Sequence, residues 1–349
     1  MKFFKKTLIY LCILSTLMLF GCSNTKPLEP LSKTELIMGT ICTVQIFDSK
    51  DNAIIDKCFN RLKELENLLS INKPGTELDK INEMAGKEPV KVSDDTFNII
   101  KSGIEYGKLS KGHFDITIGP IIKLWGIGTD HGRLPKDNEI QLEKSLINYE
   151  DIVLNEKEKT VFLKNPKMII DLGGIAKGYA ADSLNNILAE NKIESAMINL
   201  GGNLYIRGNN PNGNQWRIGI QDPNNVEDTP NATNTVGNLL ISNKSLVTSG
   251  TYERFIIVDG KKYHHIMNPK TGYPYENDLL SVSIISDKSI DGDALSTATF
   301  ALGCEEGLKF INSLDNIEAI FITKDNKVYT SKNLEGKFNV TNNKYKLVK

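Results

Sequence analysis

The chain has 349 residues, enough for one large or two modest domains, and its 40% hydrophobic and 24% charged residues are ordinary for a soluble globular protein. Its 42 Lys and Arg residues nearly balance 43 Asp and Glu residues, so the formal net charge is -1. This balance argues against nucleic acid as the main partner, because nucleic-acid-binding domains present a basic face.

The N-terminus is predicted to be an export signal that ends at a lipid-attachment site. Basic residues at Lys2, Lys5 and Lys6 precede an apolar run over residues 7–20, which is shorter than the ~20 residues that a transmembrane helix needs. The run ends in Leu-Phe-Gly-Cys, which resembles a bacterial lipobox, so Cys22 is expected to become acylated and N-terminal. The alternative is an ordinary signal peptide followed by a chance cysteine.

This interpretation divides the chain into three parts. We expect a lipoprotein signal peptide at 1–21, a lipid-anchored polar tether at 22–33 and one folded body at 34–349. The protein would then sit on the extracytoplasmic face of the cell membrane, on the periplasmic side if the cell has two membranes. The folded body contains three cysteines, Cys42, Cys58 and Cys304, which is an odd number, and their spacing is not that of metal ligands. Buried single thiols are therefore expected rather than disulfides.

The first half of the folded body is predicted to contain two amphipathic helices. A strand is expected at 34–47, followed by helices at 51–69 and 94–109, where apolar residues recur at helical spacing. The segment between these helices, 70–82, is predicted to be loop and turn, and the stretch after Gly119 and Pro120 is predicted to be irregular.

The second half is predicted to be mainly β-structure with two further helices. Short strands are expected at 152–154, 160–163 and 168–171, then a helix at 179–190. Several antiparallel strands should lie between 193 and 285, followed by a helix at 294–314 interrupted near Gly303 and a closing strand at 317–323. This pattern of elements predicts an α+β fold with helices packed on a mostly antiparallel sheet. No linker divides the body, so we expect a single compact unit.

A glycine-rich turn over residues 170–182 is the most informative segment. Its sequence is IDLGGIAKGYAAD, in which an apolar strand ends in Asp171, two glycines follow and Lys177 opens a helix. Bare backbone amides and carbonyls at such a turn can meet phosphates or a cation. The alternative is a tight strand-to-helix turn without a ligand.

A second segment, over residues 263–274, places two histidines beside a Pro-Lys-Thr-Gly turn. Histidine transfers protons near neutral pH, and Lys270 offers a phosphate contact. Adjacent residues on a strand face opposite sides, so only one of His264 and His265 can point at a given site. The other histidine is expected to be structural.

A third segment, DGDALST at residues 291–297, suits a magnesium ion. Asp293 and Thr297 are four residues apart, so both oxygens lie on one face of a helix. A carboxylate and a hydroxyl are hard oxygen ligands of the kind that Mg2+ takes together with water and substrate phosphate. The alternative is an N-cap aspartate with an incidental threonine.

Taken together, these segments resemble the ApbE family of FAD:protein FMN transferases, in the family's order, along most of the chain between Met38 and Gly303. The matching blocks are MGT (38–40), SINKPGTELDKIN (70–82), GHFDITIGPIIKLWG (112–126), DLGGIAKGYAAD (171–182), INLGGN (198–203), WRIGIQDP (216–223), TSGTYER (248–254), HIMNPKTGYP (265–274) and DALSTA (293–298). Two departures stand out, because Asn268 and Thr251 occupy positions where Asp is frequent in the family.

The resemblance implies roles for particular residues and an ApbE-like, T-fold-like architecture. It implies Mg2+ ligation by the backbone carbonyl of Gly174 with Asp293 and Thr297. His265 is our candidate for the group that accepts or relays the acceptor's proton. The positions implied to contact FAD are Met38, Ser70, Ile71, Asn72, Asp115, Lys177 and Ile266.

The expected reaction is Mg-dependent transfer of FMN from FAD to a Thr or Ser hydroxyl of an acceptor protein, with release of AMP. The resemblance implies an acceptor in an extracytoplasmic segment of a membrane redox-pump subunit. Two alternatives share the same fold: an Mg-dependent FAD pyrophosphatase that gives FMN and AMP, and a non-catalytic FAD-binding lipoprotein. A solute-binding lipoprotein is disfavoured, because the sequence shows no second similar lobe.

Overall fold

The computed structural model describes residues 29–225 and 234–348. The predicted signal peptide and the lipid-attachment site Cys22 lie outside the described residues. Within them, no helix combines the length and the apolar character that crossing a bilayer requires. The first strand, β1 (Leu31–Ile37), takes up the last residues of the expected tether at 22–33, because residues 31–33 already pair with β2 (Thr40–Ile46).

The central layer is a twisted sheet that, in the described part of the chain, has nine strands in the order β1-β2-β6-β7-β10-β13-β14-β15-β17. Neighbouring strands are antiparallel except the last pair, β15 and β17. The further strands are β6 (Ala196–Leu200), β7 (Asn203–Arg207), β10 (Lys244–Gly250), β13 (Leu279–Ser286), β14 (Glu318–Thr323), β15 (Lys327–Thr330) and β17 (Lys346–Leu347).

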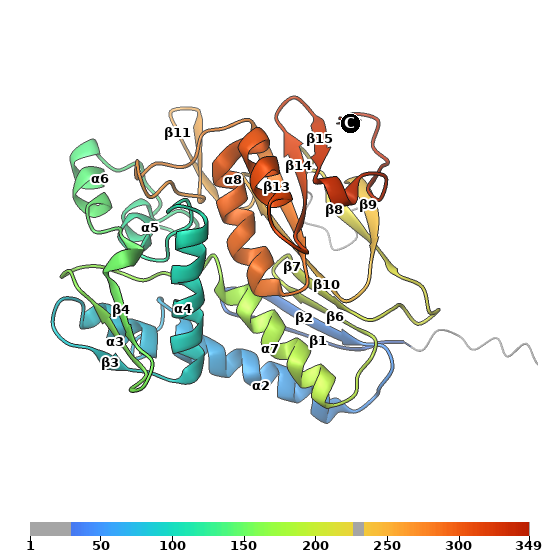
Figure 1. The fold of residues 1–349 in the computed structure, drawn as a ribbon, viewed down its shortest axis with the longest axis horizontal. Coiled ribbons are helices and arrows are strands. Elements are labelled where there is room, and N and C mark those ends of the chain that lie inside the picture. The colour runs from blue at the N-terminus through green and yellow to red at the C-terminus, as the bar shows by residue number, and fades with distance from the viewer. Residues whose placement is uncertain (1–28, 226–233, 349) are drawn as a thin grey trace, which may run out of the picture.

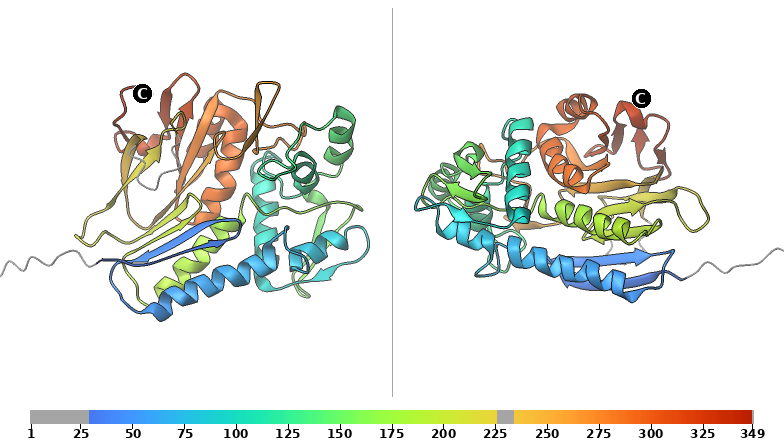
Figure 2. Two further views of the ribbon diagram at one scale, coloured as in Figure 1. Left: turned by 180° about the vertical axis from the view of Figure 1, so that it is seen from behind. Right: turned by 60° about the horizontal axis from the view of Figure 1, so that its bottom comes forward.

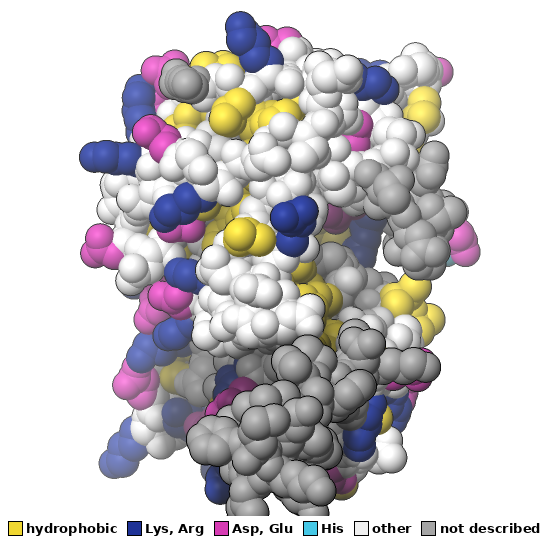
Figure 3. Space-filling view, turned by 90° about the vertical axis from the view of Figure 1, so that its right-hand side faces the viewer, with side chains coloured by type: hydrophobic (Ala, Val, Ile, Leu, Met, Phe, Trp, Pro, Cys, Tyr) yellow, Lys and Arg dark blue, Asp and Glu magenta, His cyan; other side chains and the backbone are white. Residues whose placement is uncertain are grey.

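Three long helices cover one face of this sheet (Figures 1 and 2). They are α2 (Asn52–Leu69), α7 (Ala176–Glu190) and α8 (Ser289–Asn312). The opposite face packs against a smaller sheet of β8 (Trp216–Gln221), β9 (Thr235–Ile241) and β16 (Asn339–Val340). Basic and acidic side chains are intermingled on the face of the molecule shown in Figure 3.

The remaining elements stand beside the helical layer, at the left of Figure 1. They are α3 (Glu77–Glu83), α4 (Asp94–Leu109), α5 (Gly119–Trp125), α6 (Asp137–Lys144) and the sheet of β3 (Val90–Lys91), β5 (Thr160–Leu163) and β4 (Ile152–Asn155). A separate hairpin of β11 (Phe255–Val258) and β12 (Lys261–His264) projects above them.

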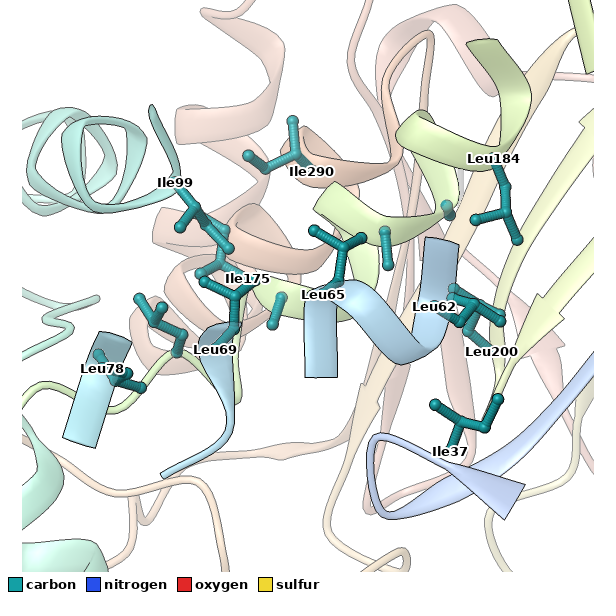
Figure 4. Close-up of a cluster of buried hydrophobic side chains, with 14 of the residues drawn as sticks. Ile37, Leu62, Leu65, Leu69, Leu78, Ile99, Ile175, Leu184, Leu200 and Ile290 are labelled. Atoms are coloured by element: carbon teal, nitrogen blue, oxygen red, sulfur yellow. The ribbon is translucent and has the colours of Figure 1, made fainter. Parts of the chain in front are cut away.

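The largest core lies between the sheet and helices α2, α7 and α8. The side chain of Asp51 caps α2 by accepting from the Ala53 N–H at 2.9 Å, and the apolar residues of α2 then fall on one buried face. Figure 4 shows part of this core, where Leu62, Leu65 and Leu69 lie among side chains from the neighbouring elements. This packing fixes α7 and α8 side by side, and both helices begin near the same place.

The predicted long helices and the α+β class are confirmed, whereas several short elements were missed. Residues 70–82 include α3, and the stretch after Gly119 contains α5 and α6 instead of irregular chain. The expected strand at 168–171 is wrong, since only Ile169 forms an isolated bridge there, with Ile118. The strand over 34–47 is a hairpin that turns at Met38 and Gly39, and β15 and β17 follow the strand expected to close the fold.

The interruption of the last long helix is confirmed at Gly303, whose φ of 76° and ψ of -177° break α8. The expected single thiols are also confirmed, since Cys42, Cys58 and Cys304 are all buried and unpaired in the described residues.

Candidate active site

A pocket opens where the turn before α7, the start of α8, the end of β10 and the base of the β11–β12 hairpin meet. Its volume is about 1300 Å3, including space open to solvent. Segments far apart in sequence therefore share one cavity. The predicted site residues that line it are Asp115, Gly174, Lys177, His265, Ile266, Asp293 and Thr297.

The three predicted metal ligands converge in this pocket. A Cβ built on Gly174 would lie 3.7 Å from the Thr297 hydroxyl oxygen, so the turn and α8 are in contact there. The carboxylate of Asp293 is 5% exposed; its Oδ2 accepts from the Gly178 N–H at 2.8 Å, and its Oδ1 lies 3.9 Å from Lys177 Nζ. Asp293 is thus held at the pocket wall by the first turn of α7.

This donor set fits magnesium once water or phosphate oxygens complete the shell. In the described residues, no group of three or more His, Cys, Asp and Glu side chains could hold a metal ion. One carboxylate, one hydroxyl and one backbone carbonyl leave an octahedral Mg2+ shell incomplete, and water or phosphate oxygens would have to fill it. The site is therefore suited to a metal that arrives with, or is completed by, its substrate.

Two contacts between α7 and α8 fix the position of Asp293. Gly178 has no side chain, and a Cβ there would meet the Ser289 carbonyl oxygen at 2.5 Å, so only glycine allows this approach. The carboxylate of Asp182, one turn further along α7, accepts from the N–H groups of Ser289 at 2.6 Å and Ile290 at 2.9 Å. Asp182 thereby caps α8 from outside, since these first N–H groups have no partner within the helix.

The two adjacent histidines face different surroundings, as expected, although β12 ends at His264 and His265 lies just beyond the strand. His264 is buried, its Nε2 is 2.8 Å from the Tyr275 carbonyl oxygen, and its ring packs edge-on against Phe300. His265 lines the pocket, and its Nδ1 lies 3.3 Å from the Arg254 carbonyl oxygen. A proton on Nδ1 donated to that carbonyl leaves Nε2 free to accept a proton in the pocket.

Burial shifts the pKa values of the titratable groups around the pocket in opposite directions. Burial, together with the positive charge of Arg254, lowers the pKa of His265 to about 4, so this imidazole is neutral at pH 7. Burial raises the pKa of Glu253 to about 7, against the opposing effect of Lys177 and Arg254, although its side chain still meets solvent within the pocket. Burial also raises the pKa of Asp171, whose Oδ1 accepts from the Gly173 N–H at 2.7 Å.

Comparison with known proteins places this arrangement in a family. The model of the ApbE family matches residues 38–321. The chain belongs to the ApbE family. A relative from Klebsiella pneumoniae (strain 342), named FAD:protein FMN transferase, is 36% identical over 317 residues, which cover 91% of this chain and 96% of the relative. A relative of the same name from Treponema pallidum (strain Nichols) is 31% identical and covers 89% of each chain.

Solved structures of the ApbE family share the fold. The ApbE protein of Thermotoga maritima superposes with a TM-score of 0.80 at 27% identity, over 88% of this chain and 99% of that one. The flavin transferase ApbE of Vibrio cholerae superposes with a TM-score of 0.78 at 26% identity and the same coverage. The expected α+β, ApbE-like fold is thereby confirmed.

Some family positions do not lie in the pocket wall of this ApbE chain. Met38 has a φ of 55° in the β1–β2 turn, and its N–H donates to Glu66 Oε1 at 2.6 Å. Ser70, Ile71 and Asn72 follow α2 in the turn before α3 and are likewise absent from the lining residues. Their contact with FAD stays a prediction.

Asp115 lines the pocket, but its oxygens already have partners. Oδ1 accepts from the N–H and hydroxyl of Thr117 at 2.8 and 2.7 Å, and Oδ2 accepts from the Tyr149 N–H at 3.1 Å. These bonds make Asp115 an organiser of the turn before α5. Lys270 is exposed and does not line the pocket, so the phosphate contact suggested for it has no support in this geometry.

Several lining residues had no predicted role, among them Asn203, Glu253 and Arg254. Asn203 is 3% exposed, and its Nδ2 has no hydrogen-bond partner in the described part of the chain. All three belong to the INLGGN and TSGTYER blocks, which were matched to the family but given no role. Their position beside glycine-containing turns was the available signal.

Proposed function

We propose that this protein transfers FMN from FAD to a Thr or Ser hydroxyl of an acceptor protein, releases AMP and requires Mg2+. The observation that carries the proposal is the meeting of Asp293, Thr297, the Gly174 turn and His265 in one pocket of an ApbE-family chain. The names of the relatives, FAD:protein FMN transferase, support the same reaction.

The pocket has an apolar side and a charged side, which suits a flavin dinucleotide. Ile118, Ile122 and Trp125 from the α5 region and Met267 form an apolar wall, which fits a planar aromatic ring. The pocket is also lined by Lys177, Asp293 and the Gly173–Gly174 turn. Cationic and backbone groups of this kind bind phosphate oxygens.

The residues suggest how the transfer proceeds. The acceptor oxygen forms a bond to the FMN phosphorus, the bond from that phosphorus to the bridging oxygen breaks, and AMP leaves with the bridging oxygen. The acceptor's proton passes to Nε2 of His265, which is neutral at pH 7 and held by the Arg254 carbonyl. A magnesium ion bound by Asp293, Thr297 and the Gly174 carbonyl would neutralise charge that develops on the phosphates.

The same machinery can use water in place of the acceptor hydroxyl, because the pocket is open to solvent. To separate the two reactions, the full chain in detergent is incubated with FAD and Mg2+, with and without a candidate acceptor. Flavin fluorescence that stays on the acceptor through denaturing electrophoresis, with equal AMP release, supports transfer. AMP release that does not depend on the acceptor supports an FAD pyrophosphatase, and FAD binding without AMP release supports a non-catalytic carrier.

We also propose that the enzyme acts at the membrane surface, anchored through acylated Cys22 on the extracytoplasmic face. The lipobox-like sequence supports this location, as does the implied acceptor, an extracytoplasmic segment of a membrane redox-pump subunit. Replacing Cys22 with Ser should move the protein from the membrane fraction to the soluble fraction while its rate on FAD in detergent is unchanged. Retention of the Cys22→Ser protein in washed membranes would contradict the anchor.

A further inference from the structure

Arg254 brings an unpaired positive charge into the pocket. Arg254 lines the pocket, is exposed and forms no ion pair with a carboxylate of the described residues. Lys177, the other cation of the pocket wall, lies 3.9 Å from the carboxylate of Asp293, so part of its charge is already balanced. Arg254 is therefore the pocket cation that is free to meet an anionic ligand.

The backbone of Arg254 is bonded to His265, and its stem lies beside Gly128. Its carbonyl oxygen accepts from the His265 N–H at 3.0 Å and lies 3.3 Å from His265 Nδ1. On the other side, Gly128 has a φ of +86°, and a Cβ built there would lie 3.2 Å from Arg254 Cδ. The glycine leaves room for the arginine stem, which lies against it.

We propose that Arg254 binds the diphosphate of the dinucleotide and stabilises the phosphate of the departing AMP. The guanidinium is planar, always charged and able to donate two parallel hydrogen bonds to phosphate oxygens. Its attachment to His265 places this donor beside the group that takes the acceptor's proton. The inference rests on the proposed function for the AMP step, but the diphosphate contact can be measured without any turnover.

The alternative cation for this role is Lys270, which the sequence alone suggested. Lys270 is exposed on the turn after Pro269 and does not line the pocket, although Pro269 does. Both residues are exposed, but only Arg254 lines the pocket, so the two variants remove the same charge from the pocket wall and from a position outside it.

The test is equilibrium binding to the full chain in detergent, in metal-free buffer, followed by flavin fluorescence or calorimetry. The probes are FAD, riboflavin, which has no phosphate, and ADP. Arg254→Met should weaken binding of FAD and ADP about tenfold to hundredfold, the usual worth of a hydrogen bond to a charged group, and leave riboflavin unchanged. Arg254→Lys should lie between the two, because a point charge replaces the fork, and Lys270→Met should match the wild type.

Three results would overturn the proposal: wild-type affinity for FAD in Arg254→Met, an equal loss of riboflavin binding, or an equal loss of FAD binding in Lys270→Met. If Arg254→Met fails to fold, the FAD-to-riboflavin ratio of Arg254→Lys decides in its place. Because binding needs no acceptor, an Arg254-dependent affinity in a protein that never transfers FMN would refute the proposed function alone. Normal transfer with Arg254-independent binding would refute this inference alone.

Discussion

Replacing Gly178 with Ala tests whether the close approach of α7 and α8 sets the metal site. The new methyl group would lie 2.5 Å from the Ser289 carbonyl oxygen, 2.7 Å from Ile290 Cα and 2.8 Å from Asp293 Cβ. Ordinary contact begins near 3.4 Å, so the start of α8 must move away from α7 by about 0.9 Å. That movement also lengthens the 2.8 Å hydrogen bond from Gly178 N–H to Asp293.

The expected effect is large on activity and small on stability. Overpacking of this kind costs about 1–3 kcal/mol, and the higher helix propensity of Ala returns about 1 kcal/mol, so the net loss of unfolding free energy is about 0–2 kcal/mol. A displacement of about 1 Å in a catalytic group can lower a rate roughly hundredfold. We therefore expect AMP release from FAD to fall about hundredfold and to need a higher Mg2+ concentration.

The matched control is Gly307→Ala, in the second half of α8. A Cβ there would lie 2.9 Å from Phe321 Cε1 and 3.1 Å from Thr299 Cγ2, so it crowds the core without touching the pocket. Thermal unfolding should report similar losses for both variants, whereas AMP release should fall only in Gly178→Ala. Wild-type activity and Mg2+ dependence in Gly178→Ala, or an equal activity loss in Gly307→Ala, would refute the reasoning.

Three further predictions concern single groups of the pocket. Asp293→Asn should lower Mg-dependent AMP release at least about hundredfold, since loss of even an outer-shell partner lowers metal affinity or activity about 10–100-fold. FAD binding in metal-free buffer should be retained. An unchanged dependence of AMP release on Mg2+ would show that Asp293 is not a metal ligand. His265→Ala should lower the transfer rate about 10²–10⁴-fold, whereas His264→Ala should mainly lower the melting temperature. If rate and melting assays show the reverse pattern, His264 is the proton acceptor and His265 is the structural residue. Glu253→Gln removes a group whose pKa is raised to about 7, so that the pH profile of this variant reports on His265. Its transfer rate should vary by less than about twofold between pH 7.5 and 5.5, because His265, whose pKa is lowered to about 4, loses its base form only as the pH falls through that value. A rate profile with its midpoint near pH 6.5 would contradict this account.

The long elements and the common position of Asp293 and Thr297 could be predicted because each depends on local spacing. Apolar residues at helical intervals mark α2 and α4, and the four-residue spacing of Asp293 and Thr297 places both oxygens on one face of α8. Strand alternation predicts that only one of His264 and His265 faces the pocket. The structure agrees on the outcome, although β12 ends at His264 and His265 lies beyond the strand. These inferences need no knowledge of what packs against the element.

The missed features depend on contacts across the fold. Asp182 caps α8 from another helix more than a hundred residues away in sequence, and no local pattern marks such a cap. Glu253 and Arg254 precede the β11–β12 hairpin and His265 follows it. Pairing of β11 with β12 brings these two ends together at the pocket. The short helices α3 and α5 have seven residues each, too few for periodicity to separate them from turns.

The burial of the cysteines has a consequence for the resistance of the folded protein to oxidation. The structure leaves Cys42, Cys58 and Cys304 as isolated thiols in the interior, and burial raises the pKa of each, to about 11, 12 and 12. Thiolate is the form that attacks a disulfide, so these sulfurs are poor substrates for oxidants and for disulfide exchange. The folded body needs no disulfide among these three cysteines, and their burial protects its native state from thiol oxidation.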